Sequence, residues 1–296
     1  MPRQILLYHG ITKYKNHGIE NYSNKHLNYK VFEKQIKFLM KYKKIVPLKK
    51  IQSSKNSIAI TFDDSYKNIS KIAYPILKKY KCPATFFVNT GFINTKKHYW
   101  TDKLEIYFNN SKANKIDLSK YKKDLIGLFN NNNKKIFLIK KIKKFLKESR
   151  PKKRDKILED IKFQLKPKLN SKKIHNYKKL SLDDLKKMHK PPNYEIGGHT
   201  VNHEILSYLN EKNIDLEIKN CINYLRQKID KNINVFSYPE GQKNHFNLKV
   251  IKNLKKYKII LCPSAIYGCI NKNQNSFNLK RKMVDFENYK FPFKIK

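Results

Sequence analysis

Two adjacent carboxylates follow a short apolar segment. Asp63 and Asp64 come directly after residues 57–62, whose β-branched and apolar side chains are typical of a buried parallel strand. At a strand end the chain turns, so both carboxylates can converge, one to ligate a metal and the other to accept a proton. A turn or a helix cap is the structural alternative for the pair taken alone.

A pair of histidines forms the second candidate. His199 and His203 would lie on one face of a helical turn, where two imidazoles can share a metal, although a surface or hydrogen-bonded pair is the alternative. Gly197 and Gly198 precede them in a chain that has only eight glycines, which indicates close approach of the backbone to another group. One Asp and two His would form a two-histidine, one-carboxylate site with open metal positions.

The third candidate is the segment Ser237-Tyr238-Pro239-Glu240-Gly241. It follows another predicted strand, residues 235–238. Its backbone N–H groups could hold an oxyanion, or the segment could be a strand followed by a simple turn.

Strands and helices alternate along the chain in a way that can position these groups. The predicted strands are residues 5–8, 57–62, 84–89, 194–199, 235–238 and 258–262. The predicted helices are residues 30–44, 69–80 with a defect at Pro75, 181–188 with Ser181 as N-cap, 214–229 and 248–257. This pattern predicts an α/β fold with parallel strands, whose carboxyl ends carry the three candidates.

Residues 96–180 differ from the rest. They show little β character and several Lys-rich amphipathic stretches, so we expect a mostly helical insertion. They hold 27 basic and 8 acidic residues, whereas residues 181–245 hold nine of each. The neutral segment 181–245 contains the second and third candidates.

The overall charge is +43, from 66 Lys and Arg against 23 Asp and Glu among 296 residues. Such an excess suggests a nucleic-acid binder, but only five of the basic residues are Arg, which nucleic-acid readers use for bidentate contacts. We therefore interpret the charge as compositional drift and expect no nucleic-acid partner. If the insertion contacts anything, we expect anionic lipid or glycan. With 40% hydrophobic residues the chain can bury a core.

We identify no targeting signal in the sequence. No apolar run approaches the roughly 18–20 residues of a membrane span, and the short run at residues 5–8 is not a signal-peptide core. We expect a cytoplasmic protein, acting at the inner membrane face if its substrate is a membrane-linked precursor. The four cysteines are widely spaced and are interpreted as free thiols.

Together the motifs TFDDSY, HTVNH and SYPEG, in this order, resemble the polysaccharide deacetylase family, also called the NodB-homology domain. LLYHGI, ATFFVNTGF and residues 257–284 are similar too. The resemblance covers roughly residues 3–95 and 181–285 and reaches only residues 99–102 of the insertion. It implies a single catalytic domain over residues 1–296, built as a distorted (β/α)7-type barrel with the insertion at about 96–180. The implied reaction is metal-dependent hydrolysis of the acetamide of an N-acetylated sugar, commonly with zinc.

The resemblance also implies roles for particular residues. Asp64, His199 and His203 would ligate the metal, and Asp63 would be the catalytic base. The backbone N–H of Tyr238 would help hold the oxyanion. Pro239, Gly241, Trp100 and Arg281 are assigned to the substrate side, with simple packing as the alternative for Trp100 and a buried bidentate role as the alternative for Arg281.

Two departures from the family pattern matter. Ser237 stands where many members carry an Arg, so we expect Asp63 to lack a cation that orients it and lowers its pKa. No histidine follows His245, so the usual C-terminal general acid is missing, and only Asp285 or Glu287 could replace it there. Our hypothesis is that His9 supplies the acid, with a structural role as the alternative. A catalytically impaired carbohydrate-binding protein is the main functional alternative, and a basic nucleic-acid or anionic-surface binder is a weaker one.

Overall fold

The computed structural model describes residues 2–168, 174–271, 273–286 and 288–295. It divides into two compact units. Unit 1 comprises residues 1–13, 23–96 and 179–296, and unit 2 comprises residues 14–22 and 97–178. Unit 2 thus contains most of the predicted insertion and, in addition, a short segment from the N-terminal part of the chain.

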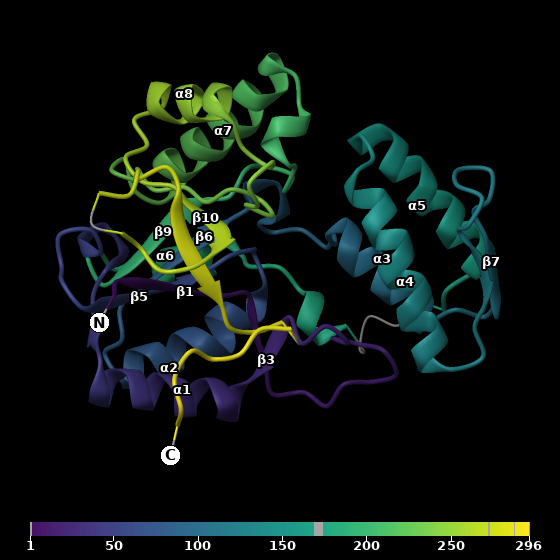
Figure 1. The fold of residues 1–296 in the computed structure, drawn as a ribbon, viewed down its shortest axis with the longest axis horizontal. Helices are drawn as coiled ribbons and strands as arrows, with labels where there is room; N and C mark the ends of the chain where they lie inside the picture. The colour runs from purple at the N-terminus through teal and green to yellow at the C-terminus, as the bar shows by residue number, and fades with distance from the viewer. Residues whose placement is uncertain (1, 169–173, 272, 287, 296) are drawn as a thin grey trace. The chain divides into compact units, whose positions relative to one another are not determined.

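Unit 1 alternates strands and helices, as the sequence predicts. Its strands are β1 (Gln4–Tyr8), β2 (Gly10–Thr12), β3 (His26–Asn28), β4 (Lys44–Ile45), β5 (Ser57–Phe62), β6 (Ala84–Val88), β9 (Tyr194–Gly198), β10 (Pro263–Tyr267) and β11 (Leu279–Met283). Its α-helices are α1 (Tyr29–Tyr42), α2 (Tyr74–Lys79), α6 (Leu182–Met188), α7 (Glu211–Lys228) and α8 (Leu248–Lys256). In Figure 1, α1 and α2 lie on one side of the strands, and α7 and α8 lie on the other.

The main sheet is parallel, in the order β10-β11-β1-β5-β6-β9, with β4 paired to the start of β5. Two isolated parallel bridges, Gly198 to Phe236 and Val235 to Leu261, continue the path from β9 to a point two residues before β10. These two bridges are single contacts rather than a ladder, so the described residues form a mostly parallel sheet without complete closure into a barrel. The predicted α/β fold is confirmed.

A shared apolar core supports this arrangement. One buried cluster takes Ile5 from β1, Ala59 from β5, Phe87 from β6 and Leu279 from β11, together with Val235 and Leu261. On the other face of the strands, the rings of Tyr8, Phe62 and Phe86 stack in sequence, and Phe32 of α1 packs against the first two. Strands buried on both faces are expected where helices cover a parallel sheet.

Local sequence features set several element boundaries. Ser181 and Asp184 form the capping box that opens α6. The defect predicted at Pro75 takes the form of a π-helical turn, Ile69–Ala73, directly before α2. Cβ atoms added at Gly197 and Gly198 would lie 2.6 Å from Phe87 and Phe236, which confirms the predicted close approach.

Other boundaries differ from prediction. The last predicted strand, residues 258–262, contains only a bridge at Leu261, and β10 begins at Pro263. The strand β11 was not predicted, because its residues, Leu-Lys-Arg-Lys-Met, carry too much charge to suggest a buried strand. Pairing with β1 and β10 overrides that weak propensity.

Unit 2 contains α3 (Trp100–Asn109), α4 (Asn132–Lys147), α5 (Pro151–Leu165) and a small antiparallel hairpin of β7 (Lys115–Asp117) and β8 (Ile126–Leu128). The helices confirm the helical expectation, and the hairpin corrects the expectation of little β structure. Asn131 caps α4 and Pro151 is the first residue of α5. Among the described residues, no helix is both long enough and apolar enough to cross a membrane.

Candidate functional site

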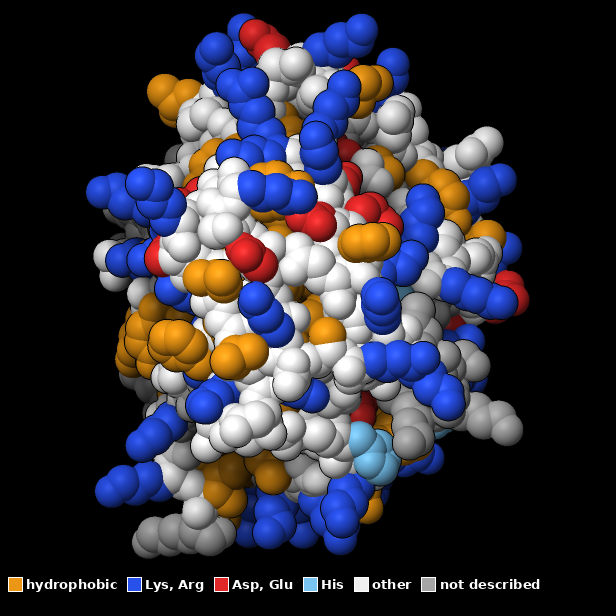
Figure 2. Space-filling view, turned by 90° about the vertical axis from the view of Figure 1, so that its right-hand side faces the viewer, with side chains coloured by type: hydrophobic (Ala, Val, Ile, Leu, Met, Phe, Trp, Pro, Cys, Tyr) orange, Lys and Arg blue, Asp and Glu red, His pale blue; other side chains and the backbone are white. Residues whose placement is uncertain are grey.

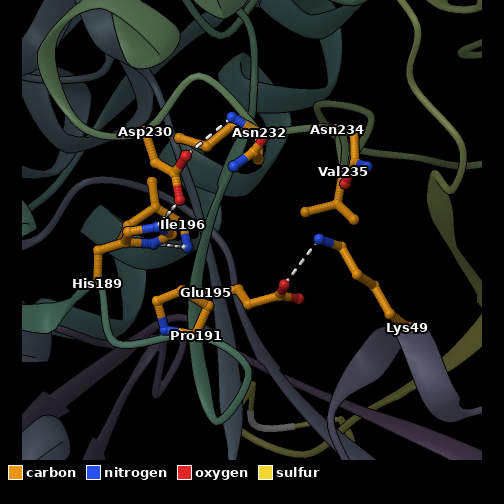
Figure 3. Close-up of a pocket in the computed structure, with 10 residues that line it drawn as sticks. Lys49, His189, Pro191, Glu195, Ile196, Asp230, Asn232, Asn234 and Val235 are labelled. Carbon is orange, nitrogen blue, oxygen red and sulfur yellow. Dashed lines mark hydrogen bonds and ion pairs between the residues drawn. The ribbon is translucent and has the colours of Figure 1, made fainter.

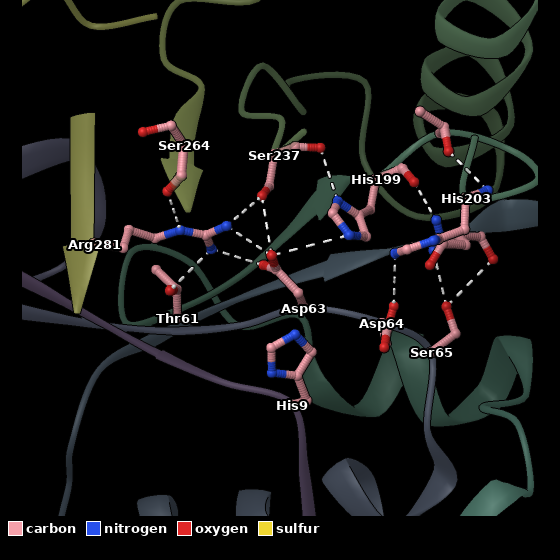
Figure 4. A network of polar contacts seen from close by, with 12 residues as sticks. His9, Thr61, Asp63, Asp64, Ser65, His199, His203, Ser237, Ser264 and Arg281 are labelled. Atoms are coloured by element: carbon pink, nitrogen blue, oxygen red, sulfur yellow. Dashed lines mark hydrogen bonds and ion pairs between the residues drawn. The ribbon is translucent and has the colours of Figure 1, made fainter. Parts of the chain in front are cut away.

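The three sequence motifs meet at the carboxyl ends of the parallel strands (Figure 4). Tyr8 pairs with Phe62, so the next residues, His9 and Asp63, leave their strands at the same level, and Asp63 N donates to Tyr8 O at 2.9 Å. On the neighbouring strands, His199 N donates to Val88 O at 3.0 Å. Strand register therefore brings together residues that lie up to 190 positions apart.

Asp63 is bound by a cation, contrary to the expectation from Ser237. Arg281 of β11 holds it in a bidentate pair, with Nη1 2.8 Å from Oδ1 and Nη2 2.7 Å from Oδ2. Ser237 Oγ donates to Oδ2 at 3.2 Å and accepts from Arg281 Nη2 at 2.9 Å. The missing Arg of the SYPEG motif is thus replaced by an Arg from another strand.

This position also corrects the substrate-side assignment of Arg281. Its side chain is 0% exposed, and its remaining donors go to Ser264 O at 2.7 Å and Thr61 Oγ1 at 3.3 Å. The buried bidentate alternative is the one that the geometry supports. Arg281 orients Asp63 rather than facing solvent.

The pair fixes the charge of Asp63. Burial, the largest single influence, raises the pKa of this carboxyl, but the Arg281 guanidinium and the neighbouring His199 together outweigh it and lower the pKa to about 2. Asp63 is therefore an ionised, oriented carboxylate across the physiological pH range.

Asp64, His199 and His203 form the one group of three potential metal ligands found among the described residues, with donor atoms within 4.8 Å of one another. His203 Nε2 lies 3.3 Å from Asp64 Oδ1. The expected helical turn is not there: residues 199–203 form a loop, in which Thr200 and His203 have φ angles of 68° and 60°. The loop, closed by a 2.9 Å hydrogen bond from His203 N to Thr200 Oγ1, produces the convergence instead.

The protonation states of this group suit a cation. His199 Nδ1 is 2.7 Å from Ser237 O, which can only accept, so Nδ1 carries the hydrogen and the lone pair is on Nε2. Burial lowers the pKa of His199 and of His203 to about 4, so both rings are neutral near pH 7. Burial also raises the pKa of Asp64, whose Oδ1 has no hydrogen-bond partner among the described residues. A buried carboxylate oxygen beside two neutral imidazoles is a donor set that divalent zinc-type metals prefer.

A carboxylate that the sequence did not reveal holds the histidine loop. Glu217 of α7 accepts hydrogen bonds from Val201 N at 2.8 Å, Asn202 N at 2.9 Å and Asn202 Nδ2 at 2.6 Å. These bonds fix the backbone between the two histidines. No sequence signal distinguishes Glu217 from other helix carboxylates, because only the tertiary structure brings α7 to this loop.

His9 pairs with an acid from the other end of the chain. Asp285 Oδ2 lies 3.0 Å from His9 Nδ1 and accepts from His9 N at 2.6 Å. Burial lowers the pKa of His9, but the carboxylates of Asp285, Asp64 and Asp63 outweigh it, so the pKa is raised above its usual value. His9 and Asp285 thus form one unit, whereas Glu287 lies outside the described residues.

The remaining predicted residues have different surroundings. Tyr238 is buried, donates its hydroxyl to Phe277 O at 2.9 Å and stacks on Phe246, so only its backbone could serve an oxyanion. Pro239 is buried beside it. Gly241 has φ of 51° and a Cβ there would lie 2.6 Å from Ala265 N, so this glycine shapes the turn. Trp100 opens α3 in unit 2, where Arg154 lies 5.5 Å from its ring, and its substrate role stays a prediction.

Comparisons with known proteins agree with the motif reading. Residues 50–116 and 154–259, more than half of the chain, match the sequence model described as polysaccharide deacetylase. A poly-beta-1,6-N-acetyl-D-glucosamine N-deacetylase of Staphylococcus aureus is 34% identical over 132 residues, which cover 40% of this chain and 43% of that protein. The match therefore spans less than half of the curated relative.

Solved structures share the fold at low identity. The Streptococcus pyogenes deacetylase PplD, solved with acetate, aligns with a TM-score of 0.59 and 19% identity over 96% of this chain and 92% of that one. BA0330 of Bacillus anthracis, described as a putative polysaccharide deacetylase, aligns with a TM-score of 0.61 and 17% identity over 98% and 66%. With this fold, the ordered motifs and a family match over more than half of its length, the chain belongs to the polysaccharide deacetylase family.

Proposed function

We propose that this chain removes acetyl groups from N-acetylated sugars of a polysaccharide or glycan precursor. The observation that carries the proposal is the convergence of Asp64, His199 and His203 beside the ionised, Arg-bound Asp63. Poly-beta-1,6-N-acetyl-D-glucosamine, the polymer in the name of the S. aureus relative, is the first substrate to test.

Asp64, His199 and His203 would hold the metal, for which zinc is our first choice. When bound, a divalent metal lowers the pKa of water and polarises a carbonyl. The chain supplies neutral imidazole donors, because burial lowers the pKa of both rings to about 4. The Ser237 carbonyl fixes the tautomer of His199. Glu217 keeps the loop that carries both histidines in place.

The proton transfers are assigned to two residues. Asp63 takes a proton from the attacking water, whose oxygen adds to the acetyl carbon. His9 then gives a proton from Nε2 to the leaving nitrogen as the C–N bond breaks, so that acetate and a free amine result. Asp285 raises the pKa of His9, which favours the protonated form that this step requires. The backbone N–H of Tyr238 is our candidate for holding the oxyanion.

The test is release of acetate and of free amine from β-1,6-linked N-acetylglucosamine oligomers by zinc-loaded protein. We expect Asp63→Asn to reduce kcat by at least about a hundredfold while metal content, measured by elemental analysis, stays at one ion per chain. His9→Ala should also lower kcat strongly, with His175→Ala of unit 2 as the control. If the loaded protein binds the oligomers without turnover, it is a carbohydrate-binding member of the family. If only Asp63→Asn lowers kcat, His9 is structural.

A further inference from the structure

The hairpin of unit 2 exposes large apolar side chains on a face without a cover in the described part of the chain. Its inner face carries Ile116, which is fully buried, and Gly127, whose added Cβ would lie 2.8 Å from Leu138 of α4. Because side chains alternate along a strand, Ile126 and Leu128 project to the opposite face. They are 46% and 66% exposed.

A third apolar side chain lies on the neighbouring helix. Gln164 of α5 bonds both backbone groups of Asp117 in β7, accepting from its N at 2.8 Å and donating to its O at 2.7 Å. Phe163, the residue before Gln164 in α5, is 75% exposed. We call Ile126, Leu128 and Phe163 the hairpin patch. Ile126 and Leu128 project from the same face of one strand, and exposed apolar side chains grouped in this way mark interaction sites on soluble surfaces.

Lysines are frequent along the hairpin that carries the patch. Residues 112–128 carry five Lys, at 112, 115, 120, 122 and 123, against Asp117 and Asp124. Lys115 is the cross-strand neighbour of Leu128, and Lys122 and Lys123 are exposed in the connection between the strands. Figure 2 shows this side of the molecule, with hydrophobic side chains set among numerous Lys and Arg side chains.

We propose that unit 2 binds the surface of an anionic lipid bilayer through the hairpin patch. Exposed apolar side chains bordered by lysines are the combination that inserts at an interface while the ammonium groups meet anionic headgroups. A purely polyanionic partner, such as an acidic glycan, would use the lysines and leave Ile126, Leu128 and Phe163 without a role. A second copy of this chain would bring two strongly basic surfaces together.

The test is co-sedimentation of the full chain with vesicles of phosphatidylcholine alone or with 30% phosphatidylglycerol. We expect binding to the anionic vesicles only. The double variant Ile126→Ser/Leu128→Ser should lower the partition coefficient at least about tenfold. The variant Lys122→Glu/Lys123→Glu should weaken it as well. Leu248→Ser, at a leucine of unit 1 that is 84% exposed, is the matched control and should bind like the unaltered chain.

Thermal melting checks that the serine variant folds, and Phe163→Ser serves as a second, independent variant of the patch. Equal binding by the hairpin variants and the Leu248 control would overturn the proposal. So would binding to an acidic polysaccharide with no binding to anionic vesicles. Light scattering that shows a dimer dissociated by Ile126→Ser/Leu128→Ser would assign the patch to self-association instead and would also overturn it.

A pocket of unit 1 does not carry a comparable argument. It has a volume of about 160 Å³ and is lined by Lys49, Glu195 and Asp230, among others (Figure 3). Lys49 already pairs with Glu195 at 2.8 Å, and Asp230 with His189 at 3.0 Å. These internal pairs leave the chemistry of an external ligand undefined.

Discussion

At the scale of single residues, the Arg281–Asp63 pair is the feature with the clearest energetic consequence. Both side chains are buried, so removal of the cation leaves an uncompensated charge. We predict that Arg281→Met lowers the free energy of unfolding at pH 7 by about 3 kcal/mol. Asp63→Asn in the same chain should restore much of that loss, because no charge then remains unpaired. Urea unfolding of the two single variants and the double variant measures this coupling.

Arg226 provides the control for that experiment. It is also partly buried, but it donates to the carbonyls of Ile233 and Tyr257 rather than to a carboxylate. Asp63→Asn should therefore give no recovery in an Arg226→Met background. Additive effects of Arg281→Met and Asp63→Asn would show that the two side chains do not depend on each other.

The two metal-site histidines make the metal-free protein sensitive to acid. Their pKa values are lowered to about 4 by burial, whereas unfolded histidine titrates near 6.5. Between these values the unfolded chain binds more protons, so stability falls as the pH falls, by about 1.4 kcal/mol per pH unit for each histidine. Asp64, whose pKa is raised by burial, acts in the opposite direction below neutral pH.

Melting curves in the presence of a chelator, at steps from pH 7 to pH 4.5, measure this dependence. His199→Gln/His203→Gln should be distinctly less sensitive to pH over this interval. Asp64 and the other carboxyls are present in both proteins, so the difference between the two pH dependences reports the contribution of the two histidines. Parallel curves for the two proteins would contradict the assignment.

At the scale of elements, the position of α7 determines the shape of the histidine loop. Glu217 accepts two backbone hydrogen bonds and one side-chain hydrogen bond from Val201 and Asn202. Glu217→Ala removes all three acceptor contacts. We predict a loss of about 10- to 100-fold in zinc affinity, the usual effect of removing a group that orients ligands. Competition with a chromophoric chelator gives this value without reference to turnover.

Glu211 on the first turn of the same helix is exposed and supplies the matched control. Glu211→Ala should leave zinc affinity unchanged, and the two variants should have similar helix content by circular dichroism. A Glu217→Ala protein that binds zinc as tightly as the Glu211 control would show that Thr200 alone closes the loop.

The strands that the sequence predicts correctly are those with strong apolar patterns. Residues 57–62 and 84–88 are buried strands with continuous apolar sequence, and Asp63 follows the first of them directly. The strand β11 could not be predicted, since three of its five residues are Lys or Arg and its pairing partners are distant in sequence. Because Arg281 lies on that strand, its partnership with Asp63 was missed. The sequence indicates His9 and, separately, Asp285 as possible acids, but only the fold shows that the two side chains form a pair.

At the scale of the whole molecule, the charge of +43 should govern the response to salt. With 66 basic and 23 acidic residues, most lysines have no acidic partner available, so mutual repulsion opposes the compact state. Screening reduces that repulsion, since the Debye length falls from about 30 Å at 0.01 M to about 3 Å at 1 M salt. We predict that the Tm rises by a few degrees between 20 and 500 mM sodium chloride. Choline chloride should act equally if screening is the cause.

The same salt series should weaken association with anionic vesicles, because there the lysines attract their partner. Opposite effects of salt on Tm and on vesicle binding therefore distinguish two effects of the excess positive charge. One is repulsion within the folded chain, and the other is attraction to anionic lipid. A Tm that falls with salt would instead mean that surface ion pairs, such as Lys256–Asp215 and Lys79–Glu33, stabilise the fold more than the unpaired lysines destabilise it. Since such exposed pairs contribute little in measured cases, the repulsion of the unpaired lysines should dominate.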